Sequence, residues 1–253
     1  MSPSGPRFHA ASVGAGHPAG PYENTDIVGY RAGQCPAPTI IVFDWEACPM
    51  MTISYPYEGA LYLNLTNKCD CACVFCLRSN GHKGSIYADD LWLEHEPSRE
   101  EILADLAQRD LSQWRELVFC GFGEPTYRLE DALWLIDELK KRGPVPPVRI
   151  NTNGHANLIH GRDVTPELAG RFDVVSISLN APTAERYCAL TRPRAGEAAW
   201  EAMLDFTRKA AQVVPDVCMT IVDKGLEPGE LEACQKLAQS LGARLRVRAY
   251  IAD

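Results

Sequence analysis

Two features that would place a chain at a membrane or on nucleic acid are absent from this sequence. The longest uninterrupted apolar run near its start is Ile40 to Phe43, whereas a membrane-spanning helix needs roughly 18 apolar residues. No cationic segment leads into an apolar stretch, as it does in a secretory signal. The 25 Lys and Arg residues are outnumbered by 33 Asp and Glu, which argues against general binding of nucleic acids. We therefore expect a cytoplasmic protein without a membrane partner.

Charged side chains are also scarce in residues 1–50. This segment holds six Gly and seven Pro but only six charged residues, and nothing in it repeats with a helical or strand period beyond residues 40–43. Such a composition is typical of a poorly ordered extension. We expect residues 1–50 to be disordered or not native, and residues 51–253 to carry the fold.

Strand-like and helix-like stretches alternate along residues 51–253. Six strands are predicted at residues 61–66, 116–120, 148–151, 174–179, 217–222 and 245–251. Helices are predicted after the Ser98–Glu101 capping box, from residue 129 to Gly143, at Thr165-Pro166, over 183–213 in two pieces around Pro193, and over 231–241. The alternation predicts an α/β fold with a parallel sheet that is doubly wound or curled into a partial barrel.

Polar and glycine-rich segments follow several of the predicted strands. They cover residues 67–76, 121–125 and 151–154, and Asn180 follows the fourth strand. In both candidate architectures, ligands bind beyond the carboxyl ends of the strands. The sequence therefore predicts that the candidate functional residues lie together at one mouth of the fold.

Ten cysteines are unusual for 253 residues, and four of them lie within eight residues. Crowding of this kind is typical of metal binding rather than of disulfides. Cys69, Cys73 and Cys76 have the spacing Cys-x3-Cys-x2-Cys directly after the first predicted strand. Three thiolates fit a [4Fe-4S] cluster with one open iron, whereas structural zinc and electron-transfer clusters normally take four ligands.

Several alternatives remain open from the cysteine spacing. Cys71 forms a second triple with Cys73 and Cys76, and structural zinc is a different metal for the same loop. Cys120 is a candidate fourth ligand, although a small core residue is its simpler role. Core positions are also expected for Cys188, Cys218 and Cys234.

Together the motifs resemble the radical S-adenosylmethionine (SAM) superfamily. Asn67-Lys-Cys69-x3-Cys73-x-Phe75-Cys76 resembles its cluster loop, and Gly121-Phe-Gly-Glu-Pro125 resembles its Gly-Gly-Glu-Pro motif, with Phe122 in place of the usual glycine. The whole stretch from Met51 onward looks like the TatD-associated radical SAM family. The likeness is carried by residues 61–69, 118–126 and 174–182.

The resemblance implies a fold, cofactors and partners. The fold would be a partial (β/α)6 TIM-like barrel of the radical SAM type, with a [4Fe-4S] cluster and SAM at its mouth. Reductive cleavage of SAM would yield methionine and a 5′-deoxyadenosyl radical that abstracts hydrogen from a substrate. The implied partners are a reductant such as flavodoxin or ferredoxin and a TatD-type metal-dependent hydrolase.

The resemblance also implies site residues. Glu124 would bind the amino group of the SAM methionine, and Gly123 would let the backbone approach the ligand. The other cofactor candidates are Phe75, Gly121, Pro125, Asn151, Asn153, Ser178, Asn180 and Arg192. Each polar member also has a structural interpretation: an Asx turn for the Asn-Thr-Asn-Gly segment, a satisfied strand hydroxyl for Ser178, and an exposed helix boundary for Arg192. No catalytic acid or base is assigned.

Two further regions are left with two interpretations each. Arg246 and Arg248 imply an anionic substrate group if they point into the barrel, and are merely solvated if they point outward. Residues 77–98 form an insertion of the kind that contacts substrates, but an exposed loop is the default role for His82 and His95. Trp92 is expected to pack this insertion onto the barrel.

Three hypotheses for the function follow. The first is a radical SAM enzyme acting on a small molecule or a modified nucleoside. The second is an activase that places a glycyl radical on a partner protein. The third is an iron-sulfur electron carrier or zinc-stabilised binding module without turnover. The complete set of cofactor motifs favours an enzyme.

Overall fold

The computed structural model describes residues 10–11, 40–41, 51–78 and 90–250. The chain divides into two compact units, Met1–Met50 and Met51–Asp253. In the first unit, strand β1 (Ala10–Ala11) pairs with the antiparallel strand β2 (Ile40–Ile41). Most of residues 1–50, with Cys35 and Cys48, lie outside the described residues, and so do His82, Lys83 and Tyr87 of the insertion. The site described below belongs to the second unit.

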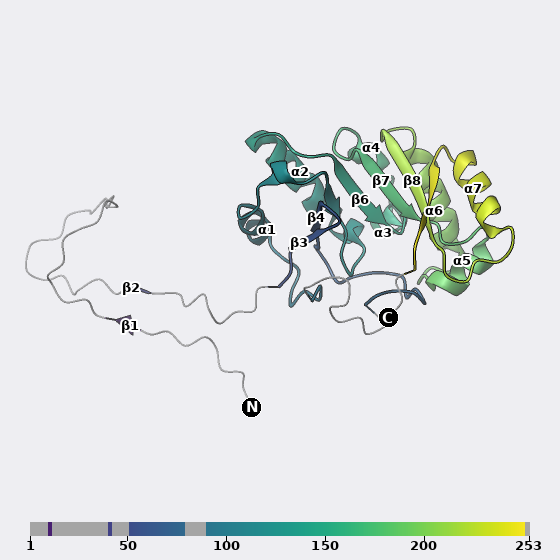
Figure 1. Cartoon of the computed structure of the whole chain (residues 1–253), viewed down its shortest axis with the longest axis horizontal. Helices are drawn as coiled ribbons and strands as arrows, with labels where there is room; N and C mark the ends of the chain where they lie inside the picture. The colour runs from purple at the N-terminus through teal and green to yellow at the C-terminus, as the bar shows by residue number, and fades with distance from the viewer. Residues whose placement is uncertain (1–9, 12–39, 42–50, 79–89, 251–253) are drawn as a thin grey trace, which may run out of the picture. The chain divides into compact units, whose positions relative to one another are not determined.

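The second unit is built on a seven-stranded sheet in the order β3-β4-β5-β6-β7-β8-β9 (Figure 1). Its strands are β3 (Ser54–Tyr57), β4 (Ala60–Leu63), β5 (Leu117–Phe119), β6 (Val148–Thr152), β7 (Val174–Ser178), β8 (Asp216–Val222) and β9 (Arg244–Arg248). Strands β4 to β9 are parallel neighbours in chain order. They correspond to the six predicted strands, so the predicted α/β parallel sheet is confirmed.

Strand β3 was not among the predicted strands. It pairs antiparallel with β4 through a tight hairpin at Glu58 and Gly59, whose φ angles are 46° and 75°. Two consecutive positive φ angles are typical of two-residue hairpin turns. Pro56 lies inside β3 and lacks a backbone donor, which restricts such a strand to the edge of a sheet. That is the position that β3 occupies.

The helices agree with the sequence pattern. They are α1 (Arg99–Leu106), α2 (Leu129–Arg142), α3 (Ala156–His160), α4 (Thr165–Leu168), α5 (Ala184–Thr191), α6 (Glu197–Ala210) and α7 (Glu230–Ser240), with 3-10 turns η2 (Leu111–Gln113) and η3 (Pro125–Arg128). Ser98 and Glu101 form the predicted capping box at α1. The chain breaks between α5 and α6 at Arg192 and Pro193, as predicted, whereas the five-residue helix α3 was not foreseen.

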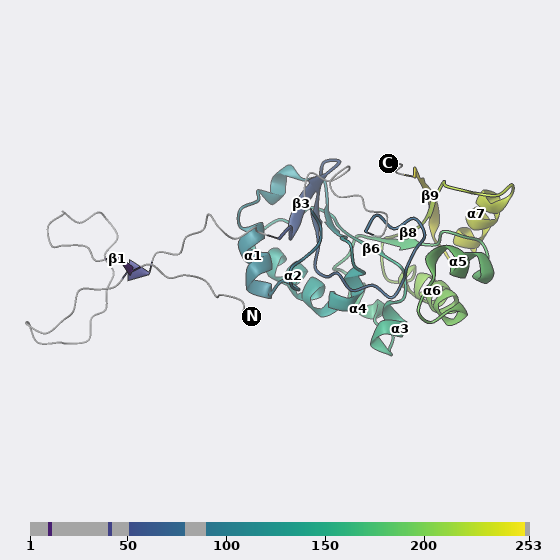
Figure 2. The same cartoon turned by 90° about the horizontal axis from the view of Figure 1, so that it is seen from below.

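Alternate strand residues separate two faces of the sheet. One face packs against the helices and supplies the main core, with Leu63, Phe119, Ile150, Ile177 and Met219 all buried. The helices form an arc around this outer face, and β3 and β9 lie near the two ends of the curved sheet (Figure 2). Among the described residues, no helix has both the length and the apolar content that a membrane span requires.

The inner face of the sheet is concave. Tyr57 of β3 and Arg248 of β9 come from opposite sheet edges, yet both line one pocket of about 290 Å³. A flat sheet would hold its two edges far apart, so the strands must curl toward closure. β3 and β9 do not pair with each other. The architecture is therefore the predicted partial barrel, open along one side.

Candidate active site

The loop that follows β4 is fixed against the end of α5. The backbone N–H of Ala72 donates to Thr191 O (3.0 Å), and that of Val74 donates to Leu190 O (2.9 Å). The Arg78 guanidinium closes the loop by donating to the carbonyl oxygens of Asn67 and Cys71. These bonds give the residues between Asn67 and Arg78, which include all four crowded cysteines, a defined backbone path.

Three thiols of this loop are only half-buried. They are Cys69, Cys73 and Cys76. Burial raises the pKa of Cys76, and the neighbouring charges of Cys73 and Cys69 raise it further. A hydrogen bond from Cys71 lowers the pKa of Cys69 despite its burial. The charges that act on Cys76 place Cys69 and Cys73 in its neighbourhood, and the ligand set Cys69, Cys73 and Cys76 stays a prediction.

Cys71 differs from these three. It is 7% exposed, and its hydrogen bonds to Cys69 and Cys73 together with burial raise its pKa. Its Sγ also lies 3.7 Å from Asn153 Nδ2 and 4.0 Å from His155 Nδ1. The Cys71 thiol is thus surrounded by protein groups, which favours a role as a hydrogen-bonding neighbour of the cluster ligands.

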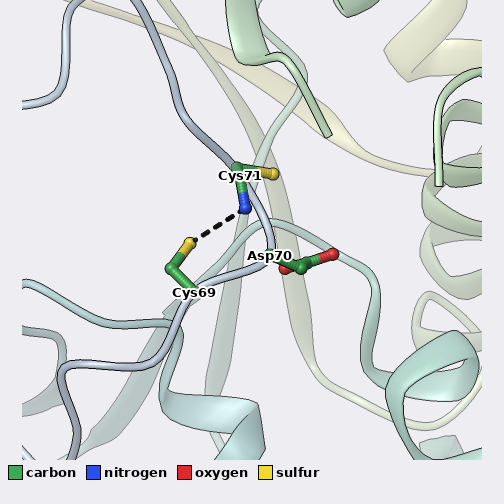
Figure 3. Close-up of side chains that lie close together, drawn as sticks. All are labelled: Cys69, Asp70 and Cys71. Atoms are coloured by element: carbon green, nitrogen blue, oxygen red, sulfur yellow. Dashed lines mark hydrogen bonds between the residues drawn. The ribbon is translucent and has the colours of Figure 1, made fainter. Parts of the chain in front are cut away.

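Cys69, Asp70 and Cys71 form the tightest group of ligand atoms in the described part of the chain, all within 4.8 Å of one another (Figure 3). The Asp70 carboxylate nevertheless points away from the Cys69 sulfur in this view. Both of its oxygens are engaged, one by Asn153 Nδ2 (2.6 Å) and one by His155 Nδ1 (2.7 Å). Because the carboxylate is already bound on both sides, this group fits a metal ion poorly.

A buried chain of polar groups lies behind the loop. His155 is fully buried, and its Nε2 lies 2.7 Å from the Tyr187 hydroxyl while its Nδ1 meets Asp70. Burial alone would raise the pKa of Asp70, but the hydrogen bonds from His155 and Asn153 outweigh it and hold that pKa below its ordinary value. In a neutral imidazole whose Nδ1 donates to the ionised Asp70, Nε2 accepts from the Tyr187 hydroxyl. Asp70 is thereby tied to helices α3 and α5.

His155→Phe is expected to destabilise the fold by about 3 kcal/mol, because it leaves the Asp70 carboxylate short of a donor and the buried Tyr187 hydroxyl without an acceptor. Urea unfolding followed by circular dichroism measures the change. The matched control is His95→Phe, since His95 is exposed and Glu101 is its one bonding partner among the described residues. That variant is expected to change stability by less than about 0.5 kcal/mol. Equal effects of the two substitutions would contradict the assignment.

The Gly121–Pro125 segment follows β5 and contacts the cysteine loop directly. The backbone N–H of Glu124 donates to Lys68 O (2.7 Å), one residue before Cys69. The Glu124 side chain is 4% exposed. Its Oε1 accepts from the Thr126 and Thr152 hydroxyls (2.6 and 2.7 Å), and its Oε2 accepts from the backbone N–H of Asn153 (2.7 Å). Burial raises the pKa of this carboxyl, and the hydrogen bonds oppose that rise.

The two oxygens of Glu124 are unequal. Oε1 accepts from the backbone N–H of Thr126 (3.1 Å) as well as from two hydroxyls, so its capacity is used. Among the described residues Oε2 has a single donor, and a carboxylate oxygen can accept more than one hydrogen bond. A carboxylate held rigidly by its first oxygen and partly free at its second is suited to bind a cationic ligand group.

Gly121 and Gly123 are required by close packing within the protein. A Cβ at Gly123 would lie 2.2 Å from Thr66 O, and one at Gly121 would lie 1.9 Å from Asn64 Oδ1. The expectation for Gly123 was close approach of the backbone to a ligand. The structure shows that both glycines let the loops after β4 and β5 touch, and the close approach of a ligand to Gly123 stays a prediction. Pro125 continues this segment as the first residue of η3.

The remaining predicted cofactor residues do not form one group in the structure. Asn153 makes the Asx turn, because its Oδ1 accepts from His155 N (2.9 Å), and its amide group binds Asp70. Asn151 lies on the concave face, where it accepts from Arg149. Asn180 is buried with a φ of 60°. Arg192 has an exposed side chain at the end of α5, outside the lining of both pockets described here.

A pocket of about 230 Å³ joins several of these parts. Phe75 and Cys76 line it from the cysteine loop, Gly121 and Phe122 from the segment after β5, and Ser178 from the end of β7. Trp92 packs edge-on against Phe122 with a centroid distance of 5.4 Å, as expected for a residue that holds the insertion onto the barrel. The predicted residues from three different strands thus meet at one mouth.

The other cysteines are placed as structural residues. Cys218 and Cys234 are at most 1% exposed, and Cys188 packs partly buried against the core. Cys120 packs against the aromatic side chains of Tyr55 and Tyr62. Burial raises the pKa of its thiol. Its packing against this second apolar cluster supports its role as a small core residue.

The site residues fit a [4Fe-4S] cluster and SAM. The loop offers three soft sulfur donors that are neither fully buried nor paired in disulfides. Glu124, which follows the neighbouring strand β5, offers a buried carboxylate whose Oε2 has one hydrogen-bond donor among the described residues. Three protein ligands rather than four would leave one iron open for a small-molecule ligand.

Some residues of the site were not identified from the sequence. Asp70 and His155 are 85 positions apart, and nothing local marks them as partners. The position of Arg149 could have been predicted from the sequence. It alternates with Val148 and Ile150 in a strand, so its side chain must lie on the face opposite the core.

Comparisons with known proteins agree with this arrangement. The profile of the Radical SAM superfamily matches residues 63–232, which is more than half of the chain. No curated protein matches the chain in sequence. Among solved structures, the crystal structure of Streptococcus suis SuiB bound to S-adenosylmethionine has a TM-score of 0.52 and 17% identity, covering 75% of this chain and 38% of that one.

Two further structures share the fold. A radical SAM methyltransferase from Sphaerobacter thermophilus has a TM-score of 0.55 and 16% identity, covering 78% of this chain and 57% of that one. Methylornithine synthase has a TM-score of 0.50 and 15% identity, covering 75% of this chain and 52% of that one. The chain thus spans roughly two fifths to three fifths of these structures' lengths. Identities this low establish a common fold and no common substrate.

Proposed function

The chain belongs to the radical SAM superfamily, and from this premise we propose that it is an enzyme that cleaves SAM reductively and abstracts hydrogen from a small molecule or a modified nucleoside. The observation that carries the proposal is the contact between its two motifs. The backbone N–H of Glu124 binds Lys68 O beside Cys69, so the cluster loop and the SAM-binding segment form one unit.

Each part of the site has a role in this proposal. Cys69, Cys73 and Cys76 would hold a [4Fe-4S] cluster, and Oε2 of Glu124 would accept a hydrogen bond from the amino group of the SAM methionine. A bound, reduced cluster supplies one electron that splits SAM into methionine and a 5′-deoxyadenosyl radical, which takes a hydrogen atom from the substrate. Phe75, Phe122 and Ser178 line the adjoining pocket and would exclude water from it.

Finer features of the proposal come from the sequence motifs. The resemblance of residues 61–69, 118–126 and 174–182 supports membership of the TatD-associated subfamily and a metal-dependent hydrolase as a partner. A flavodoxin or ferredoxin would supply the electron. We further propose that the enzyme acts in the cytoplasm, that residues 51–253 are its catalytic domain, and that Asn151, Asn153, Asn180 and Arg192 support cofactor binding.

Reductive cleavage of SAM tests the proposed function. The full chain is reconstituted with iron and sulfide without oxygen, reduced with dithionite and incubated with SAM, and 5′-deoxyadenosine is quantified by chromatography. We expect its formation to depend on the cluster and on the reductant. Omitting the reductant is the matched control. A fully loaded cluster that yields no 5′-deoxyadenosine would refute the enzyme and favour an electron carrier.

A further inference from the structure

Three arginines of strand β9 point to the same face of the sheet. Arg244, Arg246 and Arg248 alternate with apolar residues, so their side chains share one side. Arg244 binds both oxygens of Asp216, with Nε to Oδ1 at 2.8 Å and Nη2 to Oδ2 at 2.7 Å. Among the described residues, no carboxylate forms an ion pair with Arg246 or Arg248. The strand therefore neutralises one of its arginines and leaves the two nearer its carboxyl end unpaired.

Both of these arginines line the pocket of about 290 Å³ on the concave face, here called the arginine pocket. Its wall contains Tyr57, Glu58, Tyr62, Arg115, Cys120, Arg149, Asn151 and residues 246–249. Four arginines thus face a single acidic lining residue. This concentration of positive charge occurs in a chain whose formal net charge is −8.

Arg149 forms the fixed inner wall of the arginine pocket. Its side chain is 7% exposed and binds Glu116 through Nε (2.9 Å) and Nη2 (3.1 Å). The Tyr62 hydroxyl lies 3.3 Å from Nη2. Glu116 thereby holds the guanidinium of Arg149 in place, and it also pairs with Arg115 at 3.5 Å. Because one carboxylate serves both arginines, Arg246 and Arg248 add to a wall that already carries excess positive charge.

The cations of the pocket are close enough to repel one another. Partial burial lowers the pKa of Arg246, and repulsion from Arg149, Arg248 and Arg244 lowers it further. A protein that holds like charges together loses stability unless a ligand of opposite charge compensates for the repulsion. Arg246 and Arg248 are exposed, so their charges are accessible to an anion from solution, and the crowding favours a binding role.

The arginine pocket adjoins the mouth of the candidate active site. Cys120, Arg248 and Ala249 line both this pocket and the one that contains Phe75, Cys76 and Ser178. A molecule held by the arginines would therefore extend toward the cluster loop. Hydrogen abstraction requires such proximity between the bound substrate and the cofactor.

We propose that Arg246 and Arg248, backed by Arg149, bind an anionic oxygen group of the substrate, either a carboxylate or a phosphate. The guanidinium group suits this role because its planar donors match both anions in a two-point contact. The inference rests on the proposed function for the identity of the ligand as a substrate. The anion site itself rests on the geometry of strands β6 and β9.

Anion binding to the reconstituted full chain tests the proposal. Inorganic phosphate and malonate are titrated separately by calorimetry in a low-chloride buffer of constant ionic strength. We expect at least one of them to bind, and the double variant R246Q/R248Q to raise its dissociation constant at least tenfold. R244Q is the matched control on the same strand face, and we expect its dissociation constant to stay within twofold, since it loses only an exposed ion pair.

The outcomes distinguish a phosphate group from a carboxylate group on the substrate. Phosphate binding that the double variant loses identifies a phosphorylated substrate class, and malonate binding that it loses identifies a carboxylate. Binding of neither anion, or equal binding by the double variant, overturns the proposal. Circular dichroism checks that the double variant is folded, and a second double variant, R246K/R248K, should retain part of the affinity.

The same samples distinguish this inference from the proposed function. SAM cleavage in the absence of substrate is measured on the wild type and on each variant. Cleavage without anion binding leaves the proposed function intact and refutes the arginine pocket. Anion binding without cleavage retains the site and refutes the proposed function.

Discussion

Cys73→Ala should reduce 5′-deoxyadenosine formation at least 100-fold, and Cys69→Ala and Cys76→Ala should have the same effect. The reason is that a cluster held by three thiolates keeps only two after any one of these changes. Iron content after anaerobic reconstitution and the absorbance of the cluster near 400 nm measure the loss directly. All three thiols are half-buried in one loop, so we expect the polypeptide itself to remain folded.

Two other cysteines serve as controls for this prediction. Cys188→Ala alters a partly buried thiol of α5 and should leave iron content and cleavage unchanged. Cys71→Ala should retain the cluster, because the buried Cys71 thiol contacts Asn153 and His155 rather than completing the ligand set. If Cys71→Ala loses iron while Cys69→Ala retains it, the ligands are instead Cys71, Cys73 and Cys76.

Glu124→Gln should weaken SAM binding about 10- to 100-fold while the cluster is retained. A hydrogen bond to a charged group contributes about 1.5 to 3 kcal/mol, and each 1.4 kcal/mol corresponds to a factor of ten. The glutamine oxygen would remain with the three donors at Oε1, which places the amide NH2 at Oε2 against the Asn153 N–H. A cationic amino group would then meet a donor instead of an acceptor.

Equilibrium dialysis of SAM against the reconstituted protein measures this effect, with iron content determined on the same sample. Glu130→Gln is the matched control, because Glu130 is an exposed residue in the first turn of α2. A parallel loss of iron in Glu124→Gln would mean that Glu124 mainly supports the cysteine loop. Unchanged SAM affinity would remove Glu124 from the ligand site altogether.

Much of the fold could be predicted because its signals are local. The capping box at Ser98, the helix stop at Gly143 and the break at Pro193 depend on neighbouring residues, and all three occur in the structure. Strand β3 escaped prediction because Pro56 interrupts its strand pattern, and a five-residue helix such as α3 is too short to show a period. Both become visible only through pairing and packing with distant segments.

The candidate site was likewise predictable only where its residues form contiguous motifs. The cysteine spacing and the Gly121–Pro125 segment are contiguous motifs, so they could be recognised directly. The Asp70–His155–Tyr187 chain joins residues from three separate segments. The direction of Arg246 and Arg248 could not be decided from alternation alone, since β9 is an edge strand and even its alternate residue Val247 is 45% exposed.

The open side of the partial barrel has a consequence for solubility. In the described part of the second unit, β3 pairs only with β4 and β9 only with β8, so each leaves one row of backbone groups available to another chain. Such edges promote aggregation unless the sequence opposes it. Pro56 removes a donor from one edge, and the three arginines of β9 repel a second copy of the other. We therefore expect Arg246 and Arg248, which we assign to substrate binding, also to oppose the joining of sheets between separate molecules of the protein.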